Sequence, residues 1–194
     1  MTIFLARHGE TEWNRVGRWQ GNTDIPLSEV GRAQARKLAD RLRTHGITEI
    51  FTSDLSRARE TAEIVAEVLG VARVRLDPRL RERGFGCFEG LTREECETQH
   101  AEAWARYLAD RRSTPTGGEP QEQVVARVVA ALKAVAESAE LASHILVVSH
   151  GAAIRSFVHA STGIAPAPLA NTALFSLSHG ATGFTSITLE SAGE

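Results

Sequence analysis

The chain opens with Thr2-Ile3-Phe4-Leu5-Ala6-Arg7-His8-Gly9, an apolar run that ends in Arg-His-Gly. A short apolar run of this kind is typical of a buried strand in a parallel sheet. Far along the chain, Ile145-Leu146-Val147-Val148-Ser149-His150-Gly151 has the same form. Two strands that each end in His-Gly predict a single site assembled from both strand ends.

Further strands and helices are expected to alternate between these two runs. Strands are predicted at residues 2–6, 48–53, 73–76 and 145–148, and helices at 28–43, 54–69, 122–141 and 152–162. The expected N-caps of the first two helices are Ser28 and Asp54, and the glycines that close them are Gly46 and Gly70. This order predicts an α/β fold of three layers, α/β/α, around a mainly parallel central sheet.

The remaining segments add a cap and a hairpin to one domain that spans residues 1–194. Residues 9–27 are expected to be loop, and helices at 92–99 and 101–110 make segment 85–120 a small helical cap. Residues 171–178 and 184–189 alternate in polarity and predict a C-terminal hairpin, with Gly180 and Gly183 in its connection. That hairpin either ends the sheet as an edge or pairs between subunits, so a monomer and a homodimer are both expected states.

Bulk composition excludes several classes of partner. The 194 residues are 42% hydrophobic and 24% charged, with a net charge of −2, which predicts no general affinity for nucleic acid or for a membrane surface. No stretch approaches the ~20 apolar residues that span a bilayer. Cys87 and Cys96 do not form a metal-type pair, so they are interpreted as free thiols in a reducing compartment. We therefore expect a cytoplasmic protein without a metal ion or cofactor.

The residues at the strand ends suit chemistry on a phosphate. In an α/β sheet the site lies beyond the carboxyl ends of the strands, which is where His8, His150 and the segment leading to Arg57 are placed. A neutral His8 is a candidate nucleophile, with Gly9 leaving room beside it. Candidate phosphate ligands are Arg7, Arg57, a protonated His150, Asn14 and Gln20.

Each candidate also has a structural interpretation. Arg57 lies in a helix dense with charge, where solvated ion pairs are the default. Glu82, within Leu80-Arg81-Glu82-Arg83, is on its own one carboxylate in a run of charges. Sequence physics alone therefore leaves the functional roles of Arg57 and Glu82 open.

A series of motifs in order makes the chain resemble the histidine phosphatase superfamily, in the branch of cofactor-dependent phosphoglycerate mutase and its small phosphatase relatives. The motifs are Leu5-Ala6-Arg7-His8-Gly9-Glu10-Thr11, Gln20-Gly21-Asn22-Thr23, Gly31-Arg32-Ala33-Gln34-Ala35, Thr52-Ser53-Asp54-Leu55-Ser56-Arg57-Ala58 with Leu80-Arg81-Glu82, and Val148-Ser149-His150-Gly151. The likeness covers nearly the whole chain.

This resemblance implies a role for each candidate. His8 carries the phosphoryl group as phosphohistidine, and Glu82 protonates the leaving oxygen and then deprotonates the attacking water. The phosphate is bound by Arg7, Arg57 and His150, and the pocket is lined by Asn14, Gln20 and Gly21, with Gly9 and Gly151 beside the two histidines. The family needs no metal.

The resemblance also favours hydrolysis over mutase activity. Mutases of this type carry Glu-Arg-His-Tyr-Gly at the acid position, whereas this chain has Glu82-Arg83-Gly84-Phe85-Gly86. The segment between Glu82 and His150 is also shorter than in those mutases, and a shorter lid leaves a phosphohistidine open to water. We expect a metal-independent phosphatase acting on a small-molecule phosphate ester, with a phosphoglycerate mutase as the alternative.

Substrate and partner remain open at this stage. Candidates in this branch include sugar phosphates, phosphoglycerate, α-ribazole phosphate and phosphoserine, although phosphoserine enzymes place a His where Phe85 stands. A protein phosphohistidine phosphatase or signalling regulator is a further alternative. In the cap, aromatic residues either wall the pocket or pack the cap itself (Phe85, Phe88, Trp104 and Tyr107), and arginines either meet a second anionic group or are solvated (Arg93, Arg111 and Arg112).

Overall fold

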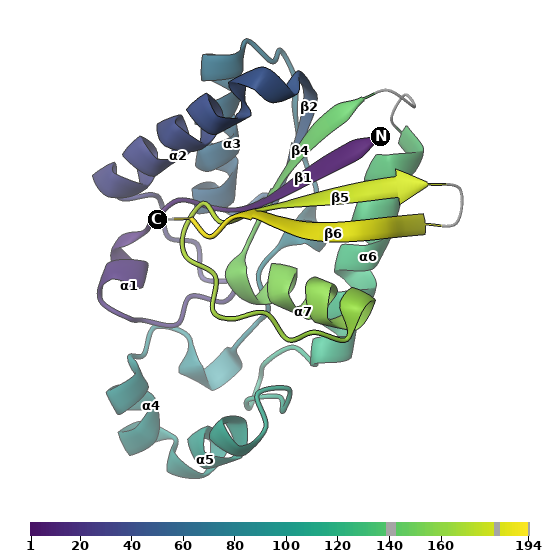
Figure 1. Ribbon diagram of the computed structural model, residues 1–194. Helices are drawn as coiled ribbons and strands as arrows, with labels where there is room; N and C mark the ends of the chain where they lie inside the picture. Colours follow the sequence, from purple (N-terminus) through teal and green to yellow (C-terminus); the bar gives the residue numbers. More distant parts are fainter. Residues whose placement is uncertain (139–142, 181–182, 194) are drawn as a thin grey trace.

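The structure, a computed structural model, describes residues 1–138, 143–180 and 183–193 (Figure 1). Its strands are β1 (Thr2–Arg7), β2 (Ile47–Thr52), β3 (Val74–Leu76), β4 (His144–Ser149), β5 (Leu174–Gly180) and β6 (Gly183–Ser191). Within the described residues these strands form one sheet in the order β3-β2-β4-β1-β5-β6. β3, β2, β4 and β1 run parallel, and β5 and β6 are antiparallel additions beside β1. The mainly parallel sheet is therefore confirmed.

Strand register brings the two His-Gly sequences together. β1 and β4 are adjacent, and Arg7 pairs with Ser149 in their ladder. The N–H of His8 then donates to the carbonyl of Ser149 at 3.0 Å. Because β2 also pairs with β4, with Thr52 opposite Val148, the end of β2 reaches the same edge of the sheet.

Helices cover both faces of this sheet and give the predicted three layers (Figure 1). The α-helices are α1 (Glu12–Arg15), α2 (Glu29–Leu42), α3 (Ser56–Leu69), α4 (Arg93–Gln99), α5 (Ala101–Ala109), α6 (Gln121–Ser138) and α7 (Gly151–Thr162). Short 3-10 turns occur at Arg43–His45, Pro78–Leu80 and Gly86–Phe88. α2 and α3 pack on one face of the sheet, and α6 and α7 pack on the other.

The alternation of side chains in the central strands explains why both faces are covered. In β1, Ile3 and Leu5 belong to the apolar cluster under α6 and α7, whereas Phe4 and Ala6 belong to the cluster under α2 and α3. All four are buried. A fully buried large aliphatic side chain contributes roughly 1.5–3 kcal/mol, so a strand that is apolar at every position is stable only between two helical layers.

Most predicted boundaries are close to the observed ones, with three differences. Ser28 caps α2 as expected, because its side chain accepts the N–H of Gly31. The prediction that Asp54 caps α3 is wrong: the N-cap is Leu55, and the Asp54 carboxylate instead receives the guanidinium of Arg81. The loop expected at 9–27 contains the short helix α1. The predicted helix 122–141 starts one residue earlier, and its last residues lie outside the described part of the chain.

The C-terminal hairpin is confirmed but starts later than predicted. Asn171 and Thr172 form a turn, and the Asn171 side chain donates to the carbonyl of His8 at 3.1 Å. The hairpin is thus anchored beneath the end of β1, and β6 is the edge of the sheet.

Segment 85–120 forms a helical cap with its own small core. Its buried aromatic side chains pack around Trp19, which comes from the loop after α1; they are Phe85, Phe88, Trp104 and Tyr107. Arg83 holds the C-terminal part of the cap, since its guanidinium donates hydrogen bonds to four backbone carbonyls there, those of Arg111, Arg112, Ser113 and Glu119. The cap thus lies beyond the carboxyl edge of the sheet (Figure 1).

None of the described helices combines the length and the apolar character that crossing a bilayer requires. Within the same residues, no three His, Cys, Asp or Glu side chains are grouped as a metal site would need. Cys87 and Cys96 are both free thiols.

Candidate active site

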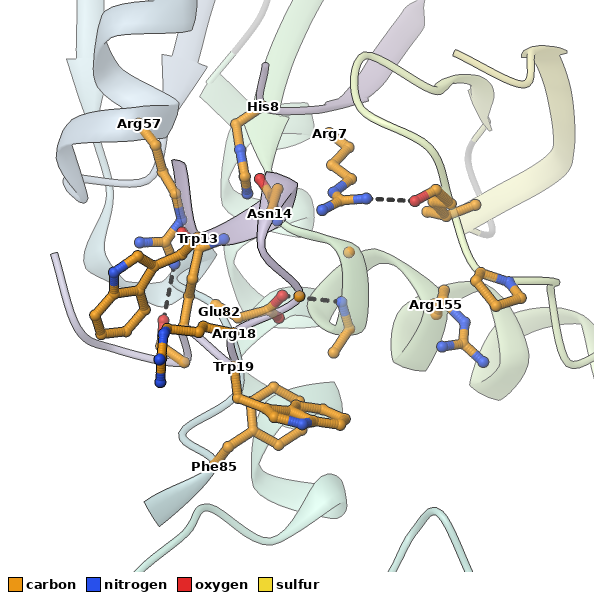
Figure 2. Close-up of a pocket in the computed structure, with 17 residues that line it drawn as sticks. Arg7, His8, Trp13, Asn14, Arg18, Trp19, Arg57, Glu82, Phe85 and Arg155 are labelled. Carbon is orange, nitrogen blue, oxygen red and sulfur yellow. Dashed lines mark hydrogen bonds between the residues drawn. The ribbon is translucent and has the colours of Figure 1, made fainter. Parts of the chain in front are cut away.

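A cavity of about 490 Å³ opens between the sheet edge and the cap. Figure 2 shows Arg7, His8, Arg57 and Glu82 directed toward this space from different elements of the fold. Arg7 ends β1, Arg57 is in the first turn of α3, and Glu82 follows a 3-10 turn. The structure therefore brings together four of the five predicted catalytic residues as lining of one cavity.

His8 is held in one tautomer. Its Nδ1 lies 2.6 Å from the carbonyl oxygen of Gly9, and a carbonyl only accepts, so Nδ1 carries the proton. Nε2 then presents a lone pair toward the cavity. Burial, reinforced by the charges of Arg57 and Arg7, lowers the pKa of His8 well below its ordinary value. The imidazole is therefore neutral near pH 7, as a nucleophile requires.

Arg57 is fully buried and tied to the loop that follows α1. Its guanidinium donates to the carbonyls of Gly21 at 2.8 Å and Thr23 at 2.9 Å. Its Nε lies 3.2 Å from Nδ1 of His150. Burial lowers the pKa of Arg57 to about 10, so this side chain is still a cation at neutral pH. The charged neighbours in α3 had favoured a solvated pair, but the fold turns Arg57 inward.

His150 lies behind His8 and does not itself line the cavity. The two rings are in edge contact, with centroids 5.1 Å apart, and His150 is fully buried. Because its Nδ1 accepts from Arg57, a neutral His150 carries its proton on Nε2, an atom with no protein partner. Burial and the adjacent Arg57 lower the pKa of His150 well below its ordinary value. Neutral His150 thus keeps one buried N–H donor, without the protonation expected from sequence.

Arg7 completes the basic side of the site. One of its terminal nitrogens donates to the carbonyl of Leu169, and its buried Nε has no protein partner. Gly151, the first residue of α7, lies beside it, since a Cβ there would stand 3.4 Å from that Nε. Among the described residues, Nε of Arg7 and Nε2 of His150 are thus two buried donors without a hydrogen-bond partner, which is uncommon in a folded protein.

Glu82 is held by the N-terminal end of α7. Its Oε2 accepts the N–H of Ala152 at 3.1 Å, and its Oε1 accepts the N–H groups of Ala153 and Arg83, each at 2.9 Å. Helix N-termini leave such donors unpaired, so the carboxylate serves as their partner. Glu82 is only 9% exposed. The structure thus fixes its carboxyl group at the cavity edge next to α7.

Some of the predicted pocket residues line the cavity, and one acts from outside it. Asn14, Gln20 and Gly21 line the cavity. Gly9 does not; it acts on His8 through its carbonyl. A side chain at Gly9 is excluded, because its Cβ would stand 2.5 Å from the carbonyl oxygen of Gly31 in α2. This close approach of two glycines holds the loop after β1 against α2.

Sequence reasoning missed several lining residues. Trp13, Arg18 and Trp19 come from the segment that was expected to be loop, and Arg155, Pro168 and Leu169 come from α7 and the chain after it. Arg18 is neutralised, because it makes a two-point ion pair with Glu95 of the cap. Arg155 follows Ala152 by three residues, and residues three apart share a helix face. Helix periodicity would therefore have indicated that Arg155 lines the same cavity as Ala152.

Glu89, which sequence reasoning also missed, positions the loop that holds Arg57. Its carboxylate accepts the N–H groups of Asn22 and Thr23, the hydroxyl of Thr23 and the N–H of Phe85. It therefore joins the cap to the residues whose carbonyls hold Arg57. Within the sequence, the Gly-Phe-Gly-Cys-Phe-Glu-Gly loop gave no sign of this role.

Comparison with known proteins places the chain in a family. The model of the histidine phosphatase superfamily (branch 1) matches residues 3–192. The chain belongs to this superfamily.

Individual relatives agree with that placement. A probable phosphoglycerate mutase of Photorhabdus laumondii is 40% identical over 168 residues, which are 84% of this chain and 76% of the relative. A mycobacterial glucosyl-3-phosphoglycerate phosphatase, solved in complex with VO3, superposes with a TM-score of 0.84 at 30% identity over 97% of each chain. A putative α-ribazole-5'-P phosphatase of Escherichia coli gives 0.85 at 26% identity, over 100% of this chain and 97% of the other. Together these likenesses support a phosphatase or mutase activity.

Proposed function

We propose that this protein is a phosphatase that hydrolyses a small-molecule phosphomonoester through a phosphohistidine on His8. The observation that carries the proposal is the fixed tautomer of His8, whose Nδ1 is bound to the Gly9 carbonyl. Its Nε2 lone pair faces a cavity that also contains two arginines and one carboxyl group.

In the first step, Nε2 of His8 attacks phosphorus as the bond from phosphorus to the leaving oxygen breaks. Arg7 and Arg57 bind the equatorial oxygens, where negative charge is greatest in the transition state, with the Nε2–H of His150 as a further donor. Glu82 in its protonated form gives its proton to the leaving oxygen, which departs as an alcohol.

In the second step, water attacks the phosphorus of phosphohistidine. Glu82, now a carboxylate, takes a proton from this water as the phosphorus–nitrogen bond breaks and inorganic phosphate forms. His8 and Glu82 return to their starting states. No step in this scheme uses a metal ion.

Hydrolysis and mutase activity differ in the molecule that attacks the phosphohistidine, which is water in a phosphatase and a phosphoglycerate hydroxyl in a mutase. The sequence Gly84-Phe85 replaces the His-Tyr of mutases at the acid position, and solved neighbours described as phosphatases support hydrolysis. The relative described as a probable phosphoglycerate mutase is the reason to keep mutase activity as the second candidate.

One assay separates the two candidates. The purified protein, with EDTA present, is supplied with a panel of phosphomonoesters while phosphate release is followed, and a coupled assay follows conversion of 3-phosphoglycerate to 2-phosphoglycerate. We expect fast phosphate release without isomerisation. Isomerisation that depends on 2,3-bisphosphoglycerate, with little hydrolysis, contradicts the proposal.

Two additions complete the design. Removing EDTA and adding Mg²⁺ is expected to leave the rate unchanged, and inhibition by EDTA that a divalent ion reverses would overturn the metal-independent scheme. A protein carrying phosphohistidine is included in the panel, because preferential turnover of that substrate would indicate a signalling regulator instead.

A further inference from the structure

A second cavity, of about 560 Å³, adjoins the catalytic one. The two cavities share Trp19, Ala152, Arg155 and Pro168 as lining, so they lie side by side. We call the second cavity the basic groove, since it is lined by Arg83, Arg111, Arg112, Arg155 and His159. Among the described residues that line it there is no Asp or Glu. In a chain whose net charge is −2, this is a local concentration of positive charge.

The arginines of the basic groove differ in how far their charge is already satisfied. Arg83 is occupied by four backbone carbonyls. Arg112 lies 3.5 Å from Asp110 in an exposed pair, and Arg111 lies over the ring of Tyr107 at 4.9 Å. Arg155 donates from Nε to the carbonyl of Pro166 at 3.2 Å, and within the described residues no carboxylate pairs with it.

Arg155 lines both cavities, and Figure 2 shows it among the residues around the catalytic one. On α7 it follows Ala152, whose N–H holds the carboxyl group of Glu82. Three residues advance a helix by about 4.5 Å, and residues three apart share a face. Arg155 therefore lies about one helical turn beyond the group that protonates the leaving oxygen, and His159 lies a further turn along the same face.

In an in-line reaction the leaving group departs on the side opposite His8, toward Glu82. The alcohol half of the substrate must therefore extend past Glu82, along α7 and into the basic groove. The first charged side chain without a carboxylate partner that it meets there is Arg155. A guanidinium with free N–H groups is suited to a carboxylate or a phosphate, because it binds two oxygens at once.

We propose that the alcohol half of the substrate bears a second anionic group, a carboxylate or a second phosphate, which Arg155 binds at the entrance of the basic groove. This inference rests on the proposed phosphatase function. It names a substrate class, phosphomonoesters of acidic alcohols, and a residue that determines specificity within that class.

The test uses substrates that differ only in the second charge. 3-Phosphoglycerate and glycerol 3-phosphate have the same length and differ in a carboxylate against a hydroxymethyl group. 6-Phosphogluconate and sorbitol 6-phosphate make the same comparison at greater length. For the wild type we expect kcat/KM to be about tenfold higher or more for the acidic member of at least one pair, which corresponds to about 1.4 kcal/mol.

Variants assign that preference to a residue. Arg155→Gln is expected to reduce the acidic-to-neutral ratio of kcat/KM toward one, and Arg155→Lys to retain part of it. Arg93→Gln is the matched control, since Arg93 is exposed on α4 and lines neither cavity, so the ratio should not change. A purely structural role for Arg155, through Pro166, would lower both members of a pair equally and leave the ratio intact.

Each outcome decides the question. A wild type that releases phosphate but does not prefer the acidic member of either pair overturns the inference, and so does a preference that survives in Arg155→Gln. A wild type that hydrolyses no member of either pair and no p-nitrophenyl phosphate contradicts the phosphatase function itself, which is a separate failure.

Discussion

The two adjoining cavities are built differently. We call the catalytic cavity the phosphate end, because the phosphate is proposed to bind there. Its side chains are held by backbone groups. The carbonyl of Gly9 holds His8, the carbonyls of Gly21 and Thr23 hold Arg57, and N–H groups of α7 hold Glu82. We call the basic groove the alcohol end, because the alcohol half of the substrate is proposed to extend into it. Its walls are side chains of the loop after α1, of the cap and of α7, such as Trp19, Arg111 and Arg155.

This difference indicates how the molecule divides its tasks. Backbone partners are available to any sequence of the same fold, so the arrangement of His8, Arg57 and Glu82 does not depend on the side chains around it. Side-chain walls change with each substitution, so the alcohol end can be altered without moving the reacting groups. The same contrast predicts that substitutions at the two ends have effects of different size and kind.

The largest effect is expected from His8→Ala, which removes the nucleophile. Turnover of every phosphomonoester should be abolished, because without Nε2 there is no covalent intermediate. The measurement is phosphate release, together with acid-labile incorporation of phosphate in the wild type. His100→Gln, in the cap and outside the catalytic cavity, is the control. A residual burst of product in His8→Ala would mean that another group attacks phosphorus.

Glu82→Gln should lower kcat by roughly 10²–10⁴-fold, the range that general acid–base catalysis contributes. The loss should be large for alkyl phosphates and smaller for p-nitrophenyl phosphate, whose leaving group departs without a proton. The ratio of the two losses is the measurement, with Glu97→Gln on the exposed face of α4 as the control. Equal losses for both leaving groups would argue against Glu82 as the acid.

Glu89→Ala tests the link between the cap and the phosphate end. It leaves four donors without their partner, at exposed and partly buried positions. Because three of these donors belong to Asn22 and Thr23, in the loop that holds Arg57, we expect kcat/KM to fall about tenfold, or about 1.4 kcal/mol, and phosphate affinity to weaken. Glu89→Gln keeps one acceptor oxygen and should restore part of both. A lower melting temperature with unchanged phosphate affinity would separate Glu89 from the site.

The smallest expected effect is on stability against acid. The folded-state pKa values of His8 and His150 are lowered, chiefly by burial, so between those values and about 6.5 the unfolded chain binds more protons. Stability is therefore fully present above about pH 6.5 and is lost as the pH falls, by at most about 1.4 kcal/mol per pH unit for each histidine. Urea unfolding between pH 7.5 and 5.5 measures this slope.

A variant attributes the slope to the site. His8→Asn should lose less stability than the wild type over the same interval, because one buried imidazole is gone. If the two proteins show the same slope, the acid sensitivity arises elsewhere in the molecule.

The sequence predicted the sheet and most of its helices because periodic apolar runs report burial directly. The β1 run and the run ending in His150 predicted two buried strands whose ends share a site, and the structure shows in addition that these strands are neighbours in the sheet. The N-cap of α3 was mispredicted. Asp54 is a good N-cap by residue type, but its carboxylate pairs with Arg81, a residue far along the chain. The role of Arg57 was left open for a related reason. The charged residues of α3 do not show by themselves which face of the helix is buried.

By itself, the sequence determined the α/β architecture and the set of groups that can act on a phosphate, because strand periodicity and motif order are local properties of the chain. Only the tertiary structure decided the tautomers of His8 and His150, the anchoring of Glu82 on α7, and the meeting of Arg155 with the cap. These depend on single hydrogen bonds and contacts between segments far apart in sequence, such as Gly21 with Arg57 or Glu82 with Ala152. The physical reason is that such contacts are selected by the packing of the whole chain, which no local pattern encodes.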